Sequence, residues 1–266
     1  MKKALALVLA ALLLVSMAAC TGTAPAATTA ATTAAATETT AAAETEASEA
    51  SAETESGKTY TVGICQLVQH PALDAATQGF KDALTEALGD AVSFNEQNAS
   101  GESVNCATIV NGLVASQVDL ILACCHWGIE KDTYPENYQQ VLGRKCIDWG
   151  VDLVIGHHPH VLQGIEEYKG RYIIYSLANF CFGANRNPAD KDTMIFQQTF
   201  TFENGQKVED RNARIIPCMV SSVSTRNDFK PTPAAGEDKK RILQRMNEYS
   251  RDFGVEFDEN GGILVN

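Results

Sequence analysis

Basic side chains are scarce in this chain of 266 residues. It carries 21 lysines and arginines against 33 aspartates and glutamates, which gives a formal net charge of -12. An acidic surface repels phosphate backbones and anionic lipid headgroups. The composition therefore excludes a nucleic-acid-binding protein and a protein that docks on a membrane by charge alone.

The apolar run near the start, from Ala4 to Val15, is too short to span a bilayer, which needs roughly 20 residues. Two lysines precede it and small residues ending in MAAC follow it, an order typical of a secretory signal peptide. This ending resembles a bacterial lipobox, whose cysteine is lipidated; the alternative is an ordinary signal peptide with a chance cysteine. We expect residues 1–20 to export the protein and Cys20 to anchor it to the cell membrane.

Residues 21–57 lack lysine, arginine and aromatic residues and consist almost entirely of Ala, Thr, Ser and Glu. Such a segment cannot bury enough apolar area to offset the loss of chain entropy on folding. We therefore expect a disordered, acidic linker between the membrane and the folded part of the chain.

The cysteines after Cys20 show no recognisable framework of disulfides or zinc ligands, since their number is odd and their spacings match neither. Most lie in apolar contexts such as ILACC, where cysteine behaves as a small buried hydrophobic residue. They are Cys65, Cys106, Cys124, Cys125, Cys146, Cys181 and Cys218.

Strands and helices alternate from residue 59 onward. Strands are expected at 59–67, 91–97, 118–125 and 151–155, and the last two are continuous apolar runs typical of a parallel sheet covered on both faces. Asp74, Ser103 and Pro135 are expected to start the intervening helices. The third helix should end at Gly150 and turn Tyr138, Val141, Leu142, Cys146 and Trp149 inward.

The character of the chain changes after Gly156. Turns at Lys169-Gly170 and at 203–206 separate β-rich runs, which predicts antiparallel hairpins. One amphipathic helix is expected from about Glu237 to Arg251. The fold class is therefore α/β, with parallel βαβ units followed by antiparallel strands.

Histidines follow two of the buried strands. The strand at 118–125 runs into HWGIE and the strand at 151–155 into GHHPH. A βαβ unit usually places its strands side by side, and open α/β sheets bind ligands at their carboxyl ends. We therefore expect His126, His157, His158 and His160 to meet in a metal or anion site; the alternative is that they cap strand ends.

Two further polar residues belong to the same region. Glu130 could be a metal ligand, an acid–base group or a solvated loop acid. Asn179, in SLANF, could supply an amide to the site or hold a turn.

The segments HWGIEKDTYP and VDLVIGHHPHVLQGIEEYKGRYIIYSLANFCFG resemble the second half of the CapA family, which is associated with capsule and poly-γ-glutamate synthesis. The resemblance covers residues 124–266 and implies a calcineurin-like metallophosphoesterase sandwich. It also implies a divalent metal (manganese, iron, zinc or magnesium) held by His126, His158 and His160. Of these, His126 and His158 would also be catalytic, and His157 would lie adjacent. Ala178 stands where the family usually has glycine.

Part of the family pattern is missing upstream. The family's first half supplies an aspartate segment and an asparagine–histidine segment, and neither occurs here. The sandwich is therefore expected to be incomplete and phosphate-ester hydrolysis to be weak or absent, unless a carboxylate such as Asp74 or Glu96 substitutes.

Residues 58–123 instead resemble the first part of a substrate-binding protein of an ABC transporter, on VGICQLVQHPALDAATQGFKDAL and QVDLILA. That resemblance implies a cleft lined by residues from Gln66 to Asp74 for a small ligand such as an aromatic amino acid. His70 is interpreted as a loop histidine. The chain then reads as two exported proteins joined near residue 124 by gene fusion, by recombination or by the joining of sequence fragments.

Three functions remain open. The first is a membrane-tethered, CapA-like protein with a metal-dependent phosphoesterase site, whose partner is the cell-surface polymer synthesis machinery or a phosphorylated small molecule. The second is a solute-binding lipoprotein. The third is a hybrid without function.

Overall fold

The structure is a computed structural model that describes residues 4–10, 58–183, 185–208 and 212–264. The described residues all belong to one compact unit. The predicted linker and Cys20 lie outside them. Of the predicted signal peptide, only β1 (Ala4–Ala10) is described.

A six-stranded sheet contains all the predicted strands that lead up to the histidines. Its strands follow the order β3-β2-β4-β5-β7-β6, and all are parallel except β6, which pairs antiparallel with β7. The predicted adjacency of the two apolar strands is confirmed, because β4 and β5 pair in parallel with His126 opposite His157. The strands are β2 (Tyr60–Gln66), β3 (Val92–Asn98), β4 (Leu120–His126), β5 (Leu153–His157), β6 (Ile165–Tyr168) and β7 (Arg171–Ile174).

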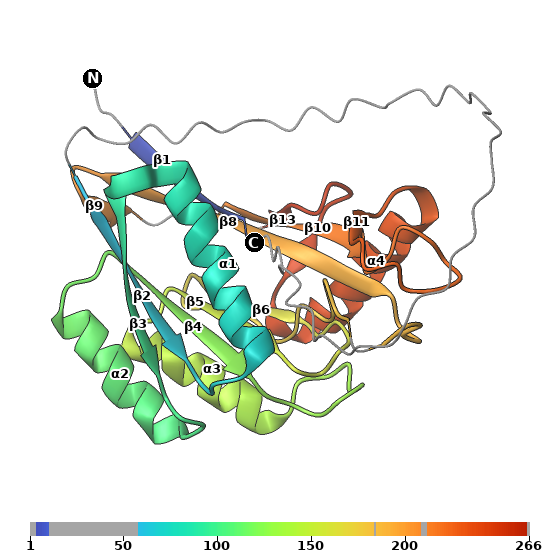
Figure 1. Ribbon diagram of the computed structural model, residues 1–266, viewed down its shortest axis with the longest axis horizontal. Coiled ribbons are helices and arrows are strands. Elements are labelled where there is room, and N and C mark those ends of the chain that lie inside the picture. The colour runs from blue at the N-terminus through green and yellow to red at the C-terminus, as the bar shows by residue number, and fades with distance from the viewer. Residues whose placement is uncertain (1–3, 11–57, 184, 209–211, 265–266) are drawn as a thin grey trace, which may run out of the picture. The chain divides into compact units, whose positions relative to one another are not determined.

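Helices cover both faces of this sheet (Figure 1). α1 (Pro71–Leu88), followed by the short helix η1 (Gly89–Ala91), packs on one face through Leu84 and Leu88. α2 (Ser103–Ala115) and α3 (Asn137–Trp149) pack on the other face through residues such as Val110 and Ile147. This two-sided burial explains why the parallel strands are continuously apolar.

Two details of the helices differ from expectation. α1 begins at Pro71, a residue suited to the first helical position, so that Asp74 lies in the first turn and does not precede the helix. α3 begins at Asn137 after a capping box formed by Glu136 and Gln139. The expected inward position of Tyr138 and Val141 is wrong, because both are exposed. The buried face of the helix includes the hydrogen-bonded Gln139 and the small Gly143 in their place.

The last third of the chain is antiparallel, as predicted. The smaller sheet contains β1, β8 (Asp192–Glu203), β9 (Gln206–Val208), β10 (Ala213–Met219) and β11 (Thr232–Pro233). α4 (Gly236–Ser250) follows, with a short helix η2 (Arg251–Phe253) and the hairpin of β12 (Glu256–Phe257) and β13 (Ile263–Leu264). The predicted α/β class is thus confirmed, and the arrangement is consistent with a metallophosphoesterase-like fold.

The core has two parts, one on each face of the larger sheet. On the face covered by α1, side chains of the larger sheet meet those of β8 and β10, and the rings of Tyr60 and Phe202 lie 4.9 Å apart. On the other face, Cys65, Cys106, Cys125 and Cys146 are buried among apolar residues. The seven cysteines of the described residues are free thiols. Within the same residues, no helix is long and apolar enough to cross a membrane.

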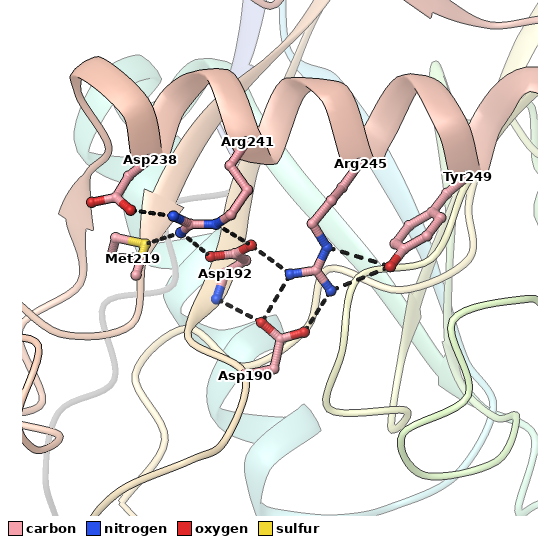
Figure 2. A network of polar contacts seen from close by, with 7 residues as sticks. All are labelled: Asp190, Asp192, Met219, Asp238, Arg241, Arg245 and Tyr249. Carbon is pink, nitrogen blue, oxygen red and sulfur yellow. Dashed lines mark hydrogen bonds and ion pairs between the residues drawn. The ribbon is translucent and has the colours of Figure 1, made fainter.

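An ion-pair network attaches α4 to the start of β8 (Figure 2). Arg241 and Arg245, one turn apart on α4, both donate to the buried carboxylate of Asp192. Arg245 also donates to Asp190 at 2.7 Å. Because each guanidinium is always charged and planar, the two arginines neutralise both carboxylates and fix the position of the helix.

Candidate metal centre

The rim of the larger sheet where β4 and β5 end holds the candidate site. His158 and His160 follow β5 with φ angles of 101° and 60°, in the region that non-glycine residues rarely adopt. Such conformations cost about 1–3 kcal/mol each and persist where the surroundings hold them. A hydrogen bond from the backbone N–H of Lys131 to the carbonyl of Pro159, at 2.7 Å, joins this loop to the one after β4.

This hydrogen bond brings Glu130 to the histidines. One ligand atom from each of Glu130, His158 and His160 lies within 4.8 Å of the other two. Glu130 is exposed, whereas the two histidines are partly buried. Two imidazoles and a carboxylate with free coordination positions are a donor set that proteins use for divalent metals. From the sequence, Glu130 could be a metal ligand, an acid–base group or a solvated loop acid. In the structure its carboxylate belongs to the cluster with His158 and His160.

Asn179 fixes the orientation of His160. Its Oδ1 lies 2.7 Å from Nδ1 of His160, and its amide Nδ2 donates to the His160 carbonyl at 3.3 Å. Because Oδ1 can only accept, the bond leaves the proton on Nδ1 and the lone pair on Nε2. That is the arrangement in which an outer residue prepares a histidine for a metal.

His126 adjoins the cluster. Its ring centre lies 4.6 Å from that of His158. Burial, reinforced by the neighbouring His158, His70 and His160, lowers the pKa of His126 to about 4, so its imidazole is neutral near pH 7. Its buried Nδ1 has no hydrogen-bond partner among the residues that the structure describes. A neutral imidazole is the form that binds metals.

His157 lies on the same side of the sheet but faces a different environment. Its side chain lines an apolar cavity under α1 together with Ile64, Phe80 and Ile155. Burial and the nearby His126 lower the pKa of His157 to about 4. Of the four histidines expected at the rim, the structure therefore gathers three in a row and turns the fourth toward the core.

The polar residues of the N-terminal segment hold α1 in place. Gln66 is buried and donates to Asp74 at 2.7 Å and to the Val68 carbonyl at 3.0 Å. Thr77 donates to Gln66 at 2.8 Å. Glu96, considered as a substitute carboxylate, pairs with Lys81 at 2.6 Å.

His70 was interpreted from the sequence as a loop histidine, and the structure places it beside the candidate site. It directly precedes α1, and its ring stacks on that of His126 with the centres 5.2 Å apart. A signal was present in the sequence, because His70 follows the carboxyl end of a parallel strand just as His126 and His158 do. The same topological rule that grouped the other histidines applies to it.

The fold and this rim define a metallophosphoesterase-like α/β protein with a candidate metal centre. Residues 11–184 match the family model described as bacterial capsule synthesis protein PGA_cap. The chain belongs to this family. The match extends across residues 58–123, which the sequence had suggested to be separate from this family.

Individual relatives agree with the family. A Bacillus anthracis protein, capsule biosynthesis protein CapA, is 32% identical over 177 residues, which are 64% of this chain and 39% of that protein. PGA biosynthesis protein CapA of Bacillus subtilis is 48% identical over 64 residues, or 24% of this chain and 17% of that protein. The chain thus spans well under half the length of these relatives.

A relative of another kind matches a shorter stretch. The tyrosine-binding protein of Clostridioides difficile is 38% identical over 74 residues, which are 27% of this chain and 21% of that protein.

Proposed function

We propose that this protein acts in the synthesis of capsule or poly-γ-glutamate at the cell envelope through a divalent metal held by Glu130, His158 and His160. The observation that carries the proposal is the approach of these three ligand groups to within 4.8 Å of one another. Membership of the capsule synthesis family supports the process. Its partner would be the cell-surface polymer machinery or a phosphorylated small molecule.

The donor set narrows the choice of metal. Imidazole suits zinc and iron, whereas magnesium takes oxygen ligands and retains several waters. A site with two histidines and one carboxylate therefore favours zinc or iron over magnesium.

The residues around the cluster suit phosphate-ester chemistry. A divalent ion in such a site polarises a phosphoryl oxygen and lowers the pKa of a water molecule. Asn179 keeps Nε2 of His160 available, and His126 provides a neutral imidazole beside the cluster. Because a single carboxylate belongs to the cluster, we expect hydrolysis to be slow.

The test is metal retention by the full chain, followed by hydrolysis of an aryl phosphate with added manganese. Glu130→Gln should lower metal affinity at least tenfold, and His158→Ala should abolish both binding and hydrolysis. Glu86→Gln, which changes an exposed carboxylate on α1, is the matched control and should have no effect. Equal metal retention by wild type and both site variants would refute the proposal.

We also propose that the protein is exported and anchored by a lipid on Cys20. The support is the lipobox-like ending of the first 20 residues together with the capsule synthesis family. Replacing Cys20 by alanine should move the protein from the membrane fraction to the soluble exported fraction, and an unchanged membrane association would refute the anchor.

The similarity to a tyrosine-binding protein favours a second candidate function, the binding of an amino acid by the N-terminal segment. If this is correct, L-tyrosine should raise the unfolding temperature of the full chain progressively with concentration. L-Lysine is the control ligand. Identical curves with both amino acids would exclude this candidate.

A further inference from the structure

One edge of the smaller sheet is covered by residues that the proposed export would remove. β1 pairs antiparallel with β8 over seven residues, from Ala4 opposite Glu203 to Ala10 opposite Gln197 (Figure 1). β9 and β10 pair with β8 along its other edge. The proposed lipid anchor on Cys20 implies that residues 1–19 are cleaved off, and β8 then loses its neighbour along residues 197–203.

This edge of β8 lacks the features that usually keep sheet edges apart. Lysine, proline and inward-pointing charges commonly prevent one edge strand from pairing with another. The sequence of β8 is DTMIFQQTFTFE, and between its two terminal acids it contains no charge, no proline and no glycine. Threonine and phenylalanine, which favour strands, make up half of it. Once uncovered, the edge is therefore a template for another strand.

Residues 197–203 of β8, QQTFTFE, are complementary to a second copy of themselves. When two such segments run antiparallel with Phe200 opposite Phe200, Thr199 lies opposite Thr201 and no charged residue meets another. Aromatic pairs and threonine pairs across strands stabilise antiparallel sheets. A twofold axis through the Phe200 pair lets the same patch serve both copies, as in symmetric dimers generally.

The charges near this segment also favour a second copy. Glu203 of one copy would lie opposite Gln197 of the other. Gln197 accepts a hydrogen bond at 2.6 Å from the exposed guanidinium of Arg214, its partner on β10. Because this bond holds the guanidinium over Gln197, it would lie close to the incoming carboxylate and attract it. Lipid anchoring would hold the copies in one membrane and so raise their effective concentration.

We propose that the processed protein forms a symmetric dimer in which the β8 strands of two copies pair antiparallel along residues 197–203. The two smaller sheets would then be continuous across the dimer. The inference rests on the proposed export and lipid anchor, since β1 occupies the same edge while residues 1–19 remain attached.

The first experiment is disulfide cross-linking of the full-length chain produced in cells that export it, with mass spectrometry to identify the N-terminus of the purified protein. The N–H of Thr199 bonds to the carbonyl of Asn212 on the other side of β8. Thr199 and Thr201 would therefore form the non-hydrogen-bonded type of pair, whose side chains approach most closely and suit a disulfide. The double variant Thr199→Cys with Thr201→Cys should give roughly tenfold more cross-linked dimer on mild oxidation than the control. The control is Ser222→Cys with Ser224→Cys, two exposed serines at the same spacing.

The second experiment is sedimentation of the same processed protein. Wild type should sediment as a dimer. Thr199→Lys with Thr201→Lys would place lysines opposite lysines at the axis and should therefore give a monomer. Unfolding temperatures of the variants within a few degrees of wild type show that the change is confined to the edge.

The outcomes separate this inference from the proposed anchor. If residues 1–19 are absent and the Thr199→Cys, Thr201→Cys chain gives no more cross-linked dimer than the control, the inference fails while the anchor stands. If residues 1–19 are retained, both fail. A wild-type dimer that survives the two lysine substitutions would place the contact elsewhere, and a cross-linked product with a different protein would show another occupant; either result overturns the inference.

Discussion

Ala178 has a left-handed backbone conformation, with φ at 63°, directly before the asparagine that orients His160. An L-residue in this region pays roughly 1–2 kcal/mol that glycine does not. The glycine that the resemblance to the CapA family leads us to expect at this position would avoid this cost. Ala178 thus adds backbone strain to a region in which His158 and His160 also have positive φ angles.

The substitution Ala178→Gly should therefore raise the free energy of unfolding by about 0.5–1 kcal/mol, after allowing for the greater entropy of glycine in the unfolded chain. Urea unfolding followed by circular dichroism measures the change. Ala83→Gly, at an exposed position in the interior of α1, is the matched control and should lower stability by about 1 kcal/mol. A loss of stability in both variants would show that residue 178 is not strained.

At the scale of elements, the attachment of α4 to β8 rests on a carboxylate with little access to water. The side chain of Asp192 is 4% exposed and pairs with both Arg241 and Arg245 (Figure 2). Removing one partner of a buried pair leaves charge without compensation, which is more costly than losing a surface pair. The largest effect on stability is therefore expected when one arginine is removed and the buried carboxylate remains.

Replacing Arg245 by methionine, which keeps the apolar stem, should cost about 2–3 kcal/mol of unfolding free energy. The loss falls short of that for a single isolated pair because Arg241 still contacts Asp192. Lys240→Met removes an exposed pair with Glu237 on the same helix and should cost at most about 0.5 kcal/mol. Thermal unfolding of both variants measures these losses. If Arg245→Met and Lys240→Met lose the same unfolding free energy, burial of Asp192 does not strengthen its ion pairs.

The network also predicts a dependence on pH. Burial acts to raise the pKa of Asp190, but hydrogen bonds from Arg245 and from the backbone of Asp192 outweigh it, so the pKa lies below its ordinary value. The resulting stabilisation is complete above the unfolded pKa, and it disappears as the pH falls through the lower folded value. The difference in unfolding free energy between wild type and Asp190→Asn should therefore shrink between about pH 5 and pH 2. If the difference in unfolding free energy stays constant over this pH range, the ionised carboxylate of Asp190 does not contribute to stability.

At the scale of the whole molecule, the join between the two resemblances lies inside β4, which β2 and β5 flank in register. The apolar residues on both sides of that join contribute to the same core; Leu120 and Leu122 pack with Ile64 and Ile155. We therefore expect the segments to fold together.

A fragment of residues 124–266 should lack a cooperative unfolding transition, since it keeps less than half of β4 and has no neighbour for it on the β2 side. The full chain, measured in parallel by circular dichroism and limited proteolysis, should show one transition that includes both segments. A fragment with its own sharp transition near that of the full chain would mean that the segments are independent.

The sequence was sufficient for the arrangement of the elements and for part of the site. Continuous apolar runs and the βαβ rule correctly placed β4 beside β5 and so brought His126 near His158. The position of Glu130 depends on a hydrogen bond between two loops, from Lys131 to Pro159, which no periodic pattern encodes. The face of α3 was misjudged because the polar Gln139 and the small Gly143 lie on its buried side, and a search for apolar periodicity does not detect them. His157 is the last residue of β5, and the side chains of consecutive strand residues point in opposite directions. The sequence therefore could not place all four histidines in one cluster.

The pairing of β1 with β8 has a consequence for the timing of synthesis. Ala4–Ala10 are made well before β8, and roughly 180 residues must follow them before Asp192, the start of β8, is made. At about 5–20 residues per second this takes on the order of 10–40 s. During that interval these residues have no β8 to pair with. If residues 1–20 act as the proposed export signal, an export apparatus would bind them before the smaller sheet forms. Folding of that sheet and export of the chain would therefore compete for the same seven residues.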